Sequence, residues 1–384
     1  MKKNMRGLTY AILSISLLTV MAGAAMAPAL GAIKEHFSNC GSMTVQFIVS
    51  LPALFIILTT FAFRALCRLM QTRTLALTGL TLYVVAGAGA FFADDIMWLL
   101  VLRALLGVSV GMIMPLSTGL LSYYFPPEEQ SRLMGLSAAM NQMGGVVATL
   151  LAGVLATVSW RCAFLVYLAG LVAVALVAVM LPNERIASKG SRLELRTLLR
   201  FHPSVTAMFL IMLLFFVYPT NFALTASASG VQPMAVTLIM VGLDVVAFFV
   251  GIAFGWLMQH LREQMKYVAP LFFIAGYAVL AFVDGIGGMI AGSILIGIAN
   301  GAGVPYVNTI ASIKGGRDAA VTVMPLISAA LYLGQFLSPL VVTPLADAIG
   351  DVRSPYIAAT TLALLFLLQV FLTRRHHALP PASR

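Results

Sequence analysis

Charged residues are scarce in this sequence. Only 9% of its 384 residues are Asp, Glu, Lys or Arg, and 61% are hydrophobic, whereas soluble domains carry roughly 25% charged residues. A water-soluble fold cannot bury that excess of apolar side chains. The apolar stretches recur at the length that crosses a bilayer core, about 20 residues each. We therefore expect most of the chain to lie in lipid.

The sequence also lacks the motifs of common enzyme chemistry. It has no Gly-rich phosphate-binding loop ending in Lys-Ser or Lys-Thr, and no His-Glu-x-x-His or Cys-x-x-Cys sequence. The three cysteines, Cys40, Cys67 and Cys162, have neither metal-ligand nor redox spacing. All five histidines lie in predicted loops or termini. We therefore expect neither an enzyme nor a metal or cofactor site.

Twelve apolar stretches are predicted to span the membrane as α-helices. They are residues 8–32, 43–63, 75–93, 96–124, 133–158, 162–182, 204–226, 234–257, 267–284, 288–312, 319–342 and 355–373. The polar stretch 183–203 divides them six and six. The sequence thus predicts an all-α membrane protein of two six-helix bundles, 1–182 and 204–384, the second ending in a short cytoplasmic tail. A cytoplasmic linker, 183–203, would join the bundles, and Ser191 is predicted to cap a short amphipathic helix within it.

The amino terminus allows a second interpretation. Lys2, Lys3 and Arg6 precede an apolar run that ends in small residues at 22–27, as in a cleaved secretory signal. The run is longer than a usual signal core, and cleavage would leave an odd number of spans. We therefore expect this segment to be retained as the first span.

The basic residues are distributed unevenly between the two sides of the predicted membrane. All but four of the 23 Lys and Arg lie in the terminal segments or in alternate loops on one side; the exceptions are Lys34, Arg161, Arg353 and the intramembrane Arg103. An excess of Lys and Arg in short loops marks the cytoplasmic side. The net charge of +10 is therefore an orientation signal and not a nucleic-acid-binding surface. Both termini are expected in the cytoplasm of a bacterial cell, with the chain in the inner membrane.

The two halves of the sequence are related to each other. Gly107-Val-Ser-Val-Gly111-Met-Ile-Met-Pro115 in the fourth span matches Gly297-Ile-Ala-Asn-Gly301-Ala-Gly-Val-Pro305 in the tenth, at an offset of 190 residues. The same offset pairs Gly144 with Gly334. A duplicated set of spans is typical of secondary transporters whose solute site lies between the repeats.

Two motifs resemble the major facilitator superfamily. They are Arg103-Ala-Leu-Leu-Gly107-Val-Ser-Val-Gly111 in the fourth span, and Trp160-Arg161 followed by Phe164 at the start of the sixth. The resemblance covers essentially the full chain. It implies a monomeric carrier of small-molecule substrates, in which two six-helix bundles alternate access to a central pathway.

The loops after the second and eighth spans resemble the family's cytoplasmic gating loop. The first keeps Arg64, Arg68 and Arg73 but lacks the family's glycine and acid, and the second has Gly255, Gln259 and Arg262, followed by Lys266. The resemblance implies a gating role for Arg64, Arg68, Arg73, Gly255, Gln259 and Arg262. Because the acid is missing from both loops, simple anchoring by positive charge is an equally good interpretation.

The fifth span resembles the family's antiporter motif. Residues 148–153 keep the motif's small residues, but Thr149 stands where proline is expected, and Pro339 occupies the corresponding position of the repeat. The similarity is to the twelve-span drug/proton antiporters. These often place an acid in the first span, and this sequence has none between Leu8 and Ala32.

Asp244 and Arg103 are the candidate proton-coupling residues. Asp244 is the one acidic residue in the middle of a predicted span, and Arg103 is the one base. An ionised group costs roughly 2.5–3.5 kcal/mol at the centre of the bilayer, so such a residue is usually functional or paired. A stripe containing Ala247, Gly251 and Gly255 is expected to turn Asp244 toward protein or a water-filled cavity, where a carboxyl holds a proton more readily. The alternatives are a structural hydrogen bond, an Arg103–Asp244 pair, or an anionic substrate bound by Arg103.

Uncharged polar residues in the spans are the candidate substrate contacts. They are Asn141, Tyr218, Asn221, Asn300, Tyr306, Asn308 and Gln335. The resemblance places the seventh and tenth spans along the pathway, and the fifth and eleventh partly so. Each residue could instead make a hydrogen bond between helices.

The resulting hypothesis is a proton-coupled exporter of amphipathic or lipophilic small molecules, such as a multidrug or metabolite efflux protein. The main alternative is an importer or facilitator of a small organic solute, which could be anionic. A membrane receptor or lipid-handling protein is a third, and it is disfavoured because the sequence contains no sizeable soluble domain. The expected partners are the substrate, protons and the lipid bilayer, without nucleic acid.

Overall fold

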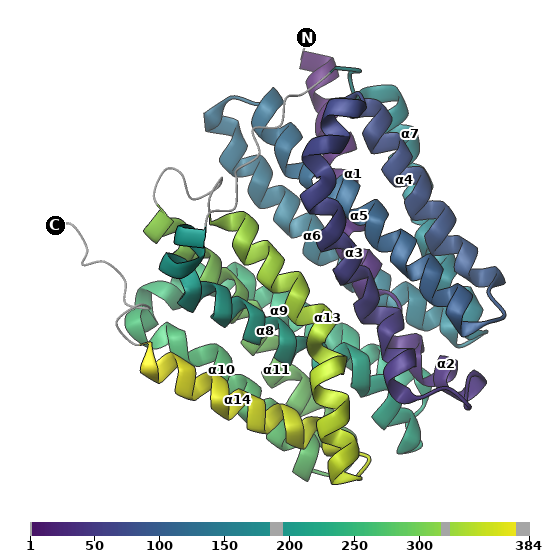
Figure 1. Cartoon of the computed structure of the whole chain (residues 1–384), viewed down its shortest axis with the longest axis vertical. Helices are drawn as coiled ribbons and strands as arrows, with labels where there is room; N and C mark the ends of the chain where they lie inside the picture. Colours follow the sequence, from purple (N-terminus) through teal and green to yellow (C-terminus); the bar gives the residue numbers. More distant parts are fainter. Residues whose placement is uncertain (1, 185–194, 316–322, 374–384) are drawn as a thin grey trace. The chain divides into compact units, whose positions relative to one another are not determined.

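A computed structural model describes residues 2–184, 195–315 and 323–373, and every regular element within those ranges is a helix (Figure 1). Eleven continuous stretches are long and apolar enough to cross a membrane. The longest, Pro233–Phe282, contains two successive helices. The prediction of an all-α protein with twelve spans is therefore confirmed.

The first half of the chain contains six spans. They are α1 (Lys2–Ala24) with η1 (Ala27–Ala29) and α2 (Leu30–His36), α3 (Ser42–Leu69), α4 (Thr72–Gly89) with η2 (Ala90–Phe92), α5 (Ile96–Tyr124), α6 (Pro127–Ala156), and η3 (Trp160–Ala169) with α7 (Gly170–Met180). The first span is interrupted at η1, where Pro28 has no N–H for an α-helical hydrogen bond. The sixth begins as a 3₁₀ helix, and the Ser159 side chain caps it by accepting from the Arg161 N–H.

The second half contains the other six spans. They are α8 (Leu195–Ala228), α9 (Pro233–Leu261), α10 (Met265–Phe282), α11 (Gly285–Gly315), α13 (Met324–Ile349) and α14 (Ser354–Leu372), with η4 (Arg262–Gln264) between α9 and α10. Helix α8 starts inside the predicted linker, so part of that linker is helical. The eleventh span continues beyond its predicted end at residue 342, to Ile349. The predicted cap Ser191 lies outside the described residues.

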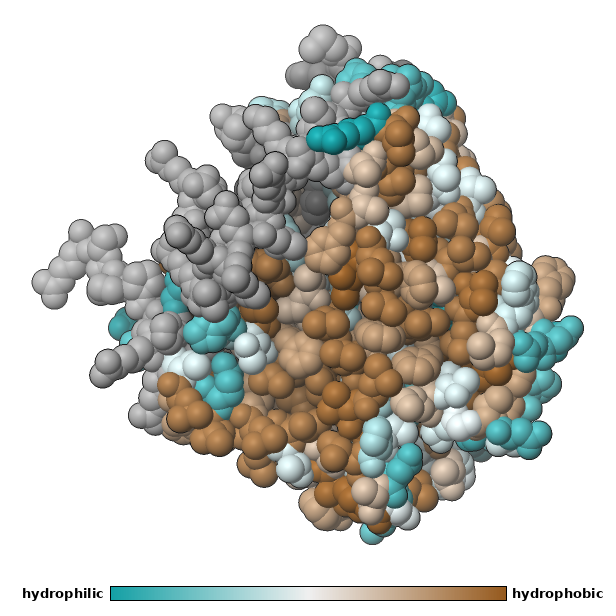
Figure 2. Space-filling view, viewed as in Figure 1, coloured by the Kyte–Doolittle hydropathy of each residue, from teal (hydrophilic) through white to brown (hydrophobic). Residues whose placement is uncertain are grey.

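Large apolar side chains cover the outside of these helices. Phe61, Phe92, Val179, Phe249 and Leu372 are among many that are more than half exposed. Figure 2 shows apolar residues over most of the visible face and hydrophilic residues toward its edges. Such a surface is stable when lipid tails cover it, because lipid requires no polar partner and the helices satisfy their own backbone groups.

The chain divides into two compact units. One comprises Met1–Lys189 and Gln232–Thr237, and the other comprises Gly190–Val231 and Leu238–Arg384. We describe each unit by itself. The domain boundaries expected from the sequence, 182/183 and 203/204, stay predictions.

Glycines that match between the two sequence halves make the same close helix contacts. A Cβ on Gly107 or Gly111 of α5 would collide with α3, and one on Gly297 or Gly301 of α11 would collide with α9. Gly144 of α6 lies against the Leu17 carbonyl of α1, and its match Gly334 of α13 lies against the Phe209 carbonyl of α8. The structure thus confirms two related six-helix bundles, and these positions stay glycine because the backbones approach too closely for a side chain.

Candidate transport site and coupling residues

Arg103 on α5 is completely buried, with 0% of its surface exposed. Its Nε donates to the Ile48 carbonyl oxygen of α3 at 2.6 Å. Its two terminal nitrogens donate to the Tyr167 hydroxyl of η3 at 2.7 Å and to the Ala22 carbonyl oxygen of α1 at 2.6 Å. One guanidinium group therefore joins α1, α3 and η3 to α5.

These three hydrogen bonds explain how the first half can bury the charge of Arg103. Burying the charge at membrane depth costs roughly 2.5–3.5 kcal/mol, whereas each hydrogen bond to a charged group contributes about 1.5–3 kcal/mol. Three such bonds offset the cost. The Tyr167 hydroxyl also donates to the Ala22 carbonyl oxygen at 3.1 Å, so the guanidinium belongs to a closed network in the core of its bundle.

Asp244 on α9 is only half-buried. The residues around it pack on α11, since the Leu243 carbonyl lies against Gly297 and the Ala247 backbone lies against Gly301. The predicted stripe of close contact does not continue along α9: a Cβ on Gly251 or Gly255 would meet no described atom within 4 Å. Asp244 is therefore held beside α11 in a region that opens along the helix.

A polar cluster lies near Asp244 inside the second unit. The Tyr218 hydroxyl of α8 is 2.7 Å from the Ser293 hydroxyl of α11, which in turn donates to the Met289 carbonyl oxygen at 2.6 Å. The Leu243 carbonyl, next to Asp244 in the chain, packs against Gly297, one turn of α11 after Ser293. Ser293 is the sequence match of Arg103 in the repeat, so the two halves use a neutral group and a cation at equivalent positions.

The other predicted substrate contacts lie in several places. Asn141 accepts a hydrogen bond from Thr19 at 2.9 Å, which joins α6 to α1. Buried Asn221 donates to its own helix at Val217, at 2.9 Å. Gln335 donates to the Met212 sulfur at 3.7 Å. For these three residues the interaction seen is structural, and their predicted contact with substrate stays a prediction.

Helix α11 carries the remaining candidates. The Oδ1 atom of Asn300 is buried and has no hydrogen-bond partner among the described residues. Asn308 is half-buried. Tyr306 is buried and lines a small pocket between α8, α10, α11 and α14. The structure therefore gathers Tyr218 and Asp244 in one region and assigns Tyr306 to a separate pocket.

The six predicted gating residues differ in their surroundings. Arg73, the second residue of α4, donates to the Ala178 carbonyl oxygen of α7. Arg68, Gly255, Gln259 and Arg262 are exposed. The side chain of Arg64 lies outside the described residues. Arg262 has a positive φ of 45°, as expected of a residue that breaks the helix between α9 and α10.

The structure supplies an acid near the first gating loop that the sequence analysis missed. The Glu184 carbonyl accepts from the Thr72 N–H at 2.9 Å, and its carboxylate accepts from the Tyr124 hydroxyl at 3.4 Å. Glu184 is distant in sequence from the motif, and only the fold reveals the contact.

Two further features repeat between the halves and were not predicted. Tyr83 of α4 donates to the Leu18 carbonyl oxygen at 3.2 Å, and Tyr277 of α10 donates to the Leu214 carbonyl oxygen. Each half also has an ion pair between a loop aspartate and an arginine near the start of its last span. Arg161 pairs with Asp94 at 2.6 Å, and Arg353 pairs with Asp284. Of these residues only Asp94 and Asp284 keep the offset of 190, so a comparison of the two halves at that offset would have found neither feature in full.

The whole chain is similar to known transporters. A model of the Major Facilitator Superfamily matches residues 12–339. Quinolone resistance protein NorA of Staphylococcus aureus is 26% identical over 302 residues, which cover 73% of this chain and 74% of NorA. A bacterial homolog of the human lysosomal transporter Spinster, solved inward-facing and unoccupied, superposes with a TM-score of 0.82 at 14% identity over 100% of both chains. The nucleoside transporter NupG, solved as a point mutant, superposes with a TM-score of 0.74 at 12% identity over 96% of this chain and 99% of NupG.

Proposed function

Since the chain belongs to the major facilitator superfamily and is therefore a multi-pass membrane transporter, we propose that it exports amphipathic or lipophilic small molecules in exchange for protons. The observation that carries this proposal is the similarity to NorA over about three quarters of both chains, together with a half-buried mid-span carboxylate in the second unit. By this proposal the protein works as a monomer in a bacterial inner membrane, with both termini in the cytoplasm.

Asp244 is the proton carrier in this proposal. A carboxylate beside Tyr218 and Ser293 can take a proton when its side of the pathway is open to acid, and release it when the other side opens. Neutral Asp244 would then permit the substrate-free return step. Tyr218, Asn300 and Asn308 would offer the few polar contacts, and apolar side chains would supply most of the binding.

Arg103 acts in this proposal as a positioning residue. Its three donated hydrogen bonds hold α1, α3 and η3 together, so it keeps the first bundle rigid while the bundles alternate. This arrangement disfavours the alternative in which Arg103 binds an anionic solute, because an anion would have to displace three protein acceptors.

Ethidium efflux tests the proposal. Cells that lack their own drug pumps would express wild type, Asp244→Asn, the exposed control Asp347→Asn, or empty vector, and efflux would be followed with and without a protonophore. We expect protonophore-sensitive efflux by wild type and Asp347→Asn, and at least about a hundredfold loss in Asp244→Asn if the proton step is obligatory. Equal retention in all four cultures would refute ethidium-type export, and protonophore-insensitive flux by wild type would favour a facilitator.

A further inference from the structure

A pocket inside the second unit contains a cation that has no acceptor in the described part of the chain. Lys266, the second residue of α10, is only 8% exposed. Among the side chains and backbone groups that the structure describes, its ammonium group has neither a hydrogen-bond acceptor nor a carboxylate within bonding distance. The neighbour that it does meet is the ring of Tyr267, whose centroid is 5.3 Å from Nζ.

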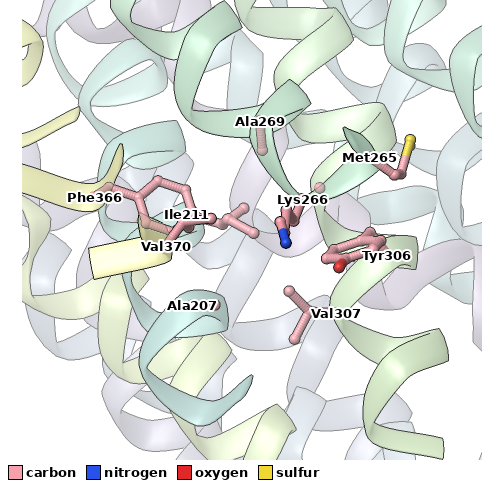
Figure 3. Close-up of a pocket in the computed structure, with 10 residues that line it drawn as sticks. Ala207, Ile211, Met265, Lys266, Ala269, Tyr306, Val307, Phe366 and Val370 are labelled. Carbon is pink, nitrogen blue, oxygen red and sulfur yellow. The ribbon is translucent and has the colours of Figure 1, made fainter. Parts of the chain in front are cut away.

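The ammonium group points into the pocket. Figure 3 shows Nζ of Lys266 directed between Ile211, Val307 and Tyr306. The rest of the lining is apolar and comes from α8, α10, α11 and α14; it is Ala207, Met265, Ala269, Gly303, Phe366 and Val370. The free space is about that of one water molecule.

The first half of the chain shows what an equivalent cation requires. Arg73 is likewise the second residue of its helix, α4, and it donates to the carbonyl oxygen of Ala178, the third residue from the end of α7. Val370, the third residue from the end of α14, lines the Lys266 pocket. Within the described ranges, Lys266 makes no corresponding bond. In the first half the Ala178 carbonyl accepts from Arg73, whereas in the second half no residue that lines the pocket accepts from Lys266.

The position of the pocket indicates what could supply that acceptor. Lys266 closely follows η4, in which no residue is buried. Beside it, Tyr267 packs on Phe371 at 5.1 Å, and Phe371 is 41% exposed. Aromatic rings at helix ends are typical of the membrane interface, and basic pockets between spans on the cytoplasmic side bind anionic lipid head groups.

We propose that Lys266 and its pocket bind a phosphate oxygen, supplied by an anionic phospholipid at the cytoplasmic interface. The pocket admits a single oxygen atom, so the rest of the head group would lie at the surface near Tyr267. Dissolved inorganic phosphate presents the same oxygen and is the other source to be tested. This inference does not depend on the transported substrate or on proton coupling.

The test uses delipidated protein and two probes. Native mass spectrometry would measure binding of phosphatidylglycerol and of zwitterionic phosphatidylcholine to wild type, Lys266→Met and Lys314→Met. The control Lys314 is a basic residue at the end of α11 that does not line the pocket. A thermal-shift series with potassium phosphate against potassium chloride would measure the dissolved anion.

We expect phosphatidylglycerol to bind wild type and Lys314→Met, and to bind Lys266→Met at least about tenfold more weakly, as loss of a charge-assisted hydrogen bond requires. A phosphate-dependent thermal shift that Lys266→Met alone loses would support the site with dissolved phosphate as its source. Equal responses of Lys266→Met and wild type to both probes would overturn the proposal. Lys266→Gln provides the same test if the methionine variant does not fold.

Discussion

The two halves of the chain share one helix scaffold but treat their intramembrane charge in opposite ways. The first half locks Arg103 into its core with three hydrogen bonds, and the second half leaves Asp244 half-exposed beside α11. The position equivalent to Arg103 holds Ser293, a neutral group paired with Tyr218. The first half thus satisfies its charge with protein acceptors, whereas the second leaves its carboxylate partly exposed, where a proton can reach it.

The features that repeat between the halves are scaffold features. Matched glycines set the helix contacts, and Tyr83 and Tyr277 tie the third span of each bundle to the first. The features that differ are Arg103, Asp244 and Lys266. In a duplicated fold, the residues that differ between the two halves are therefore the first candidates for function.

The largest effect should come from Arg103. Arg103→Met leaves the Ile48 and Ala22 carbonyls and the Tyr167 hydroxyl short of a buried donor, so we expect the free energy of unfolding to fall by at least about 3 kcal/mol. Ser293→Ala removes one hydrogen bond from Tyr218 and should cost about 1 kcal/mol. Thermal unfolding in detergent, followed by size-exclusion fluorescence, measures both.

Arg103→Lys separates charge from geometry. A single ammonium group cannot reach three acceptors as a planar guanidinium does, so this variant should lie between wild type and Arg103→Met. If Arg103→Met were no less stable than Ser293→Ala, the core role of Arg103 would be wrong.

The second prediction concerns the matched glycines and should affect both halves alike. Gly144→Ala and Gly334→Ala each push a methyl group into a backbone carbonyl of the facing helix, closer than real Cβ atoms come. Overpacking of this kind costs about 1–3 kcal/mol. Gly119→Ala is the control, because a Cβ there meets no described atom within 4 Å. A large loss in one glycine variant alone would show that the two bundles are not packed in the same way.

Much of the scaffold could be predicted because hydrophobic length and the glycine repeat act locally. The twelve spans and the Gly107/Gly297 match follow from residues close together in the chain. The helix breaks were harder: Pro28 signals one, but the 3₁₀ start of the sixth span depends on the Ser159 cap, which is a short-range detail of backbone geometry.

The polar contacts could not be predicted, because their partners come from distant spans. Arg103 stands out in the sequence as the one base within a predicted span, but its acceptors Ala22, Ile48 and Tyr167 lie on three other elements. Glu184 carries no motif, and the Lys266 pocket requires four helices. A sequence shows that a buried charge needs an explanation, and only the fold shows whether a partner is present.

The smallest effects are expected at the exposed ion pairs that end both bundles. Asp94→Asn and Asp284→Asn each remove a pair whose Asp side chain is 83% or 88% exposed. Exposed pairs contribute about 0–1 kcal/mol. Added salt screens the pair, so it should lower the free energy of unfolding of wild type toward that of the variants.

Asp95→Ala, one residue away, is the control. Its carboxylate caps α5 by accepting from the Met97 and Trp98 N–H groups at 3.0 and 3.2 Å, so it should cost more, about 0.5–2 kcal/mol, with less dependence on salt. If Asp94→Asn or Asp284→Asn lowered the free energy of unfolding more than Asp95→Ala does, that ion pair, unlike its counterpart in the other half, would be a main support of its bundle.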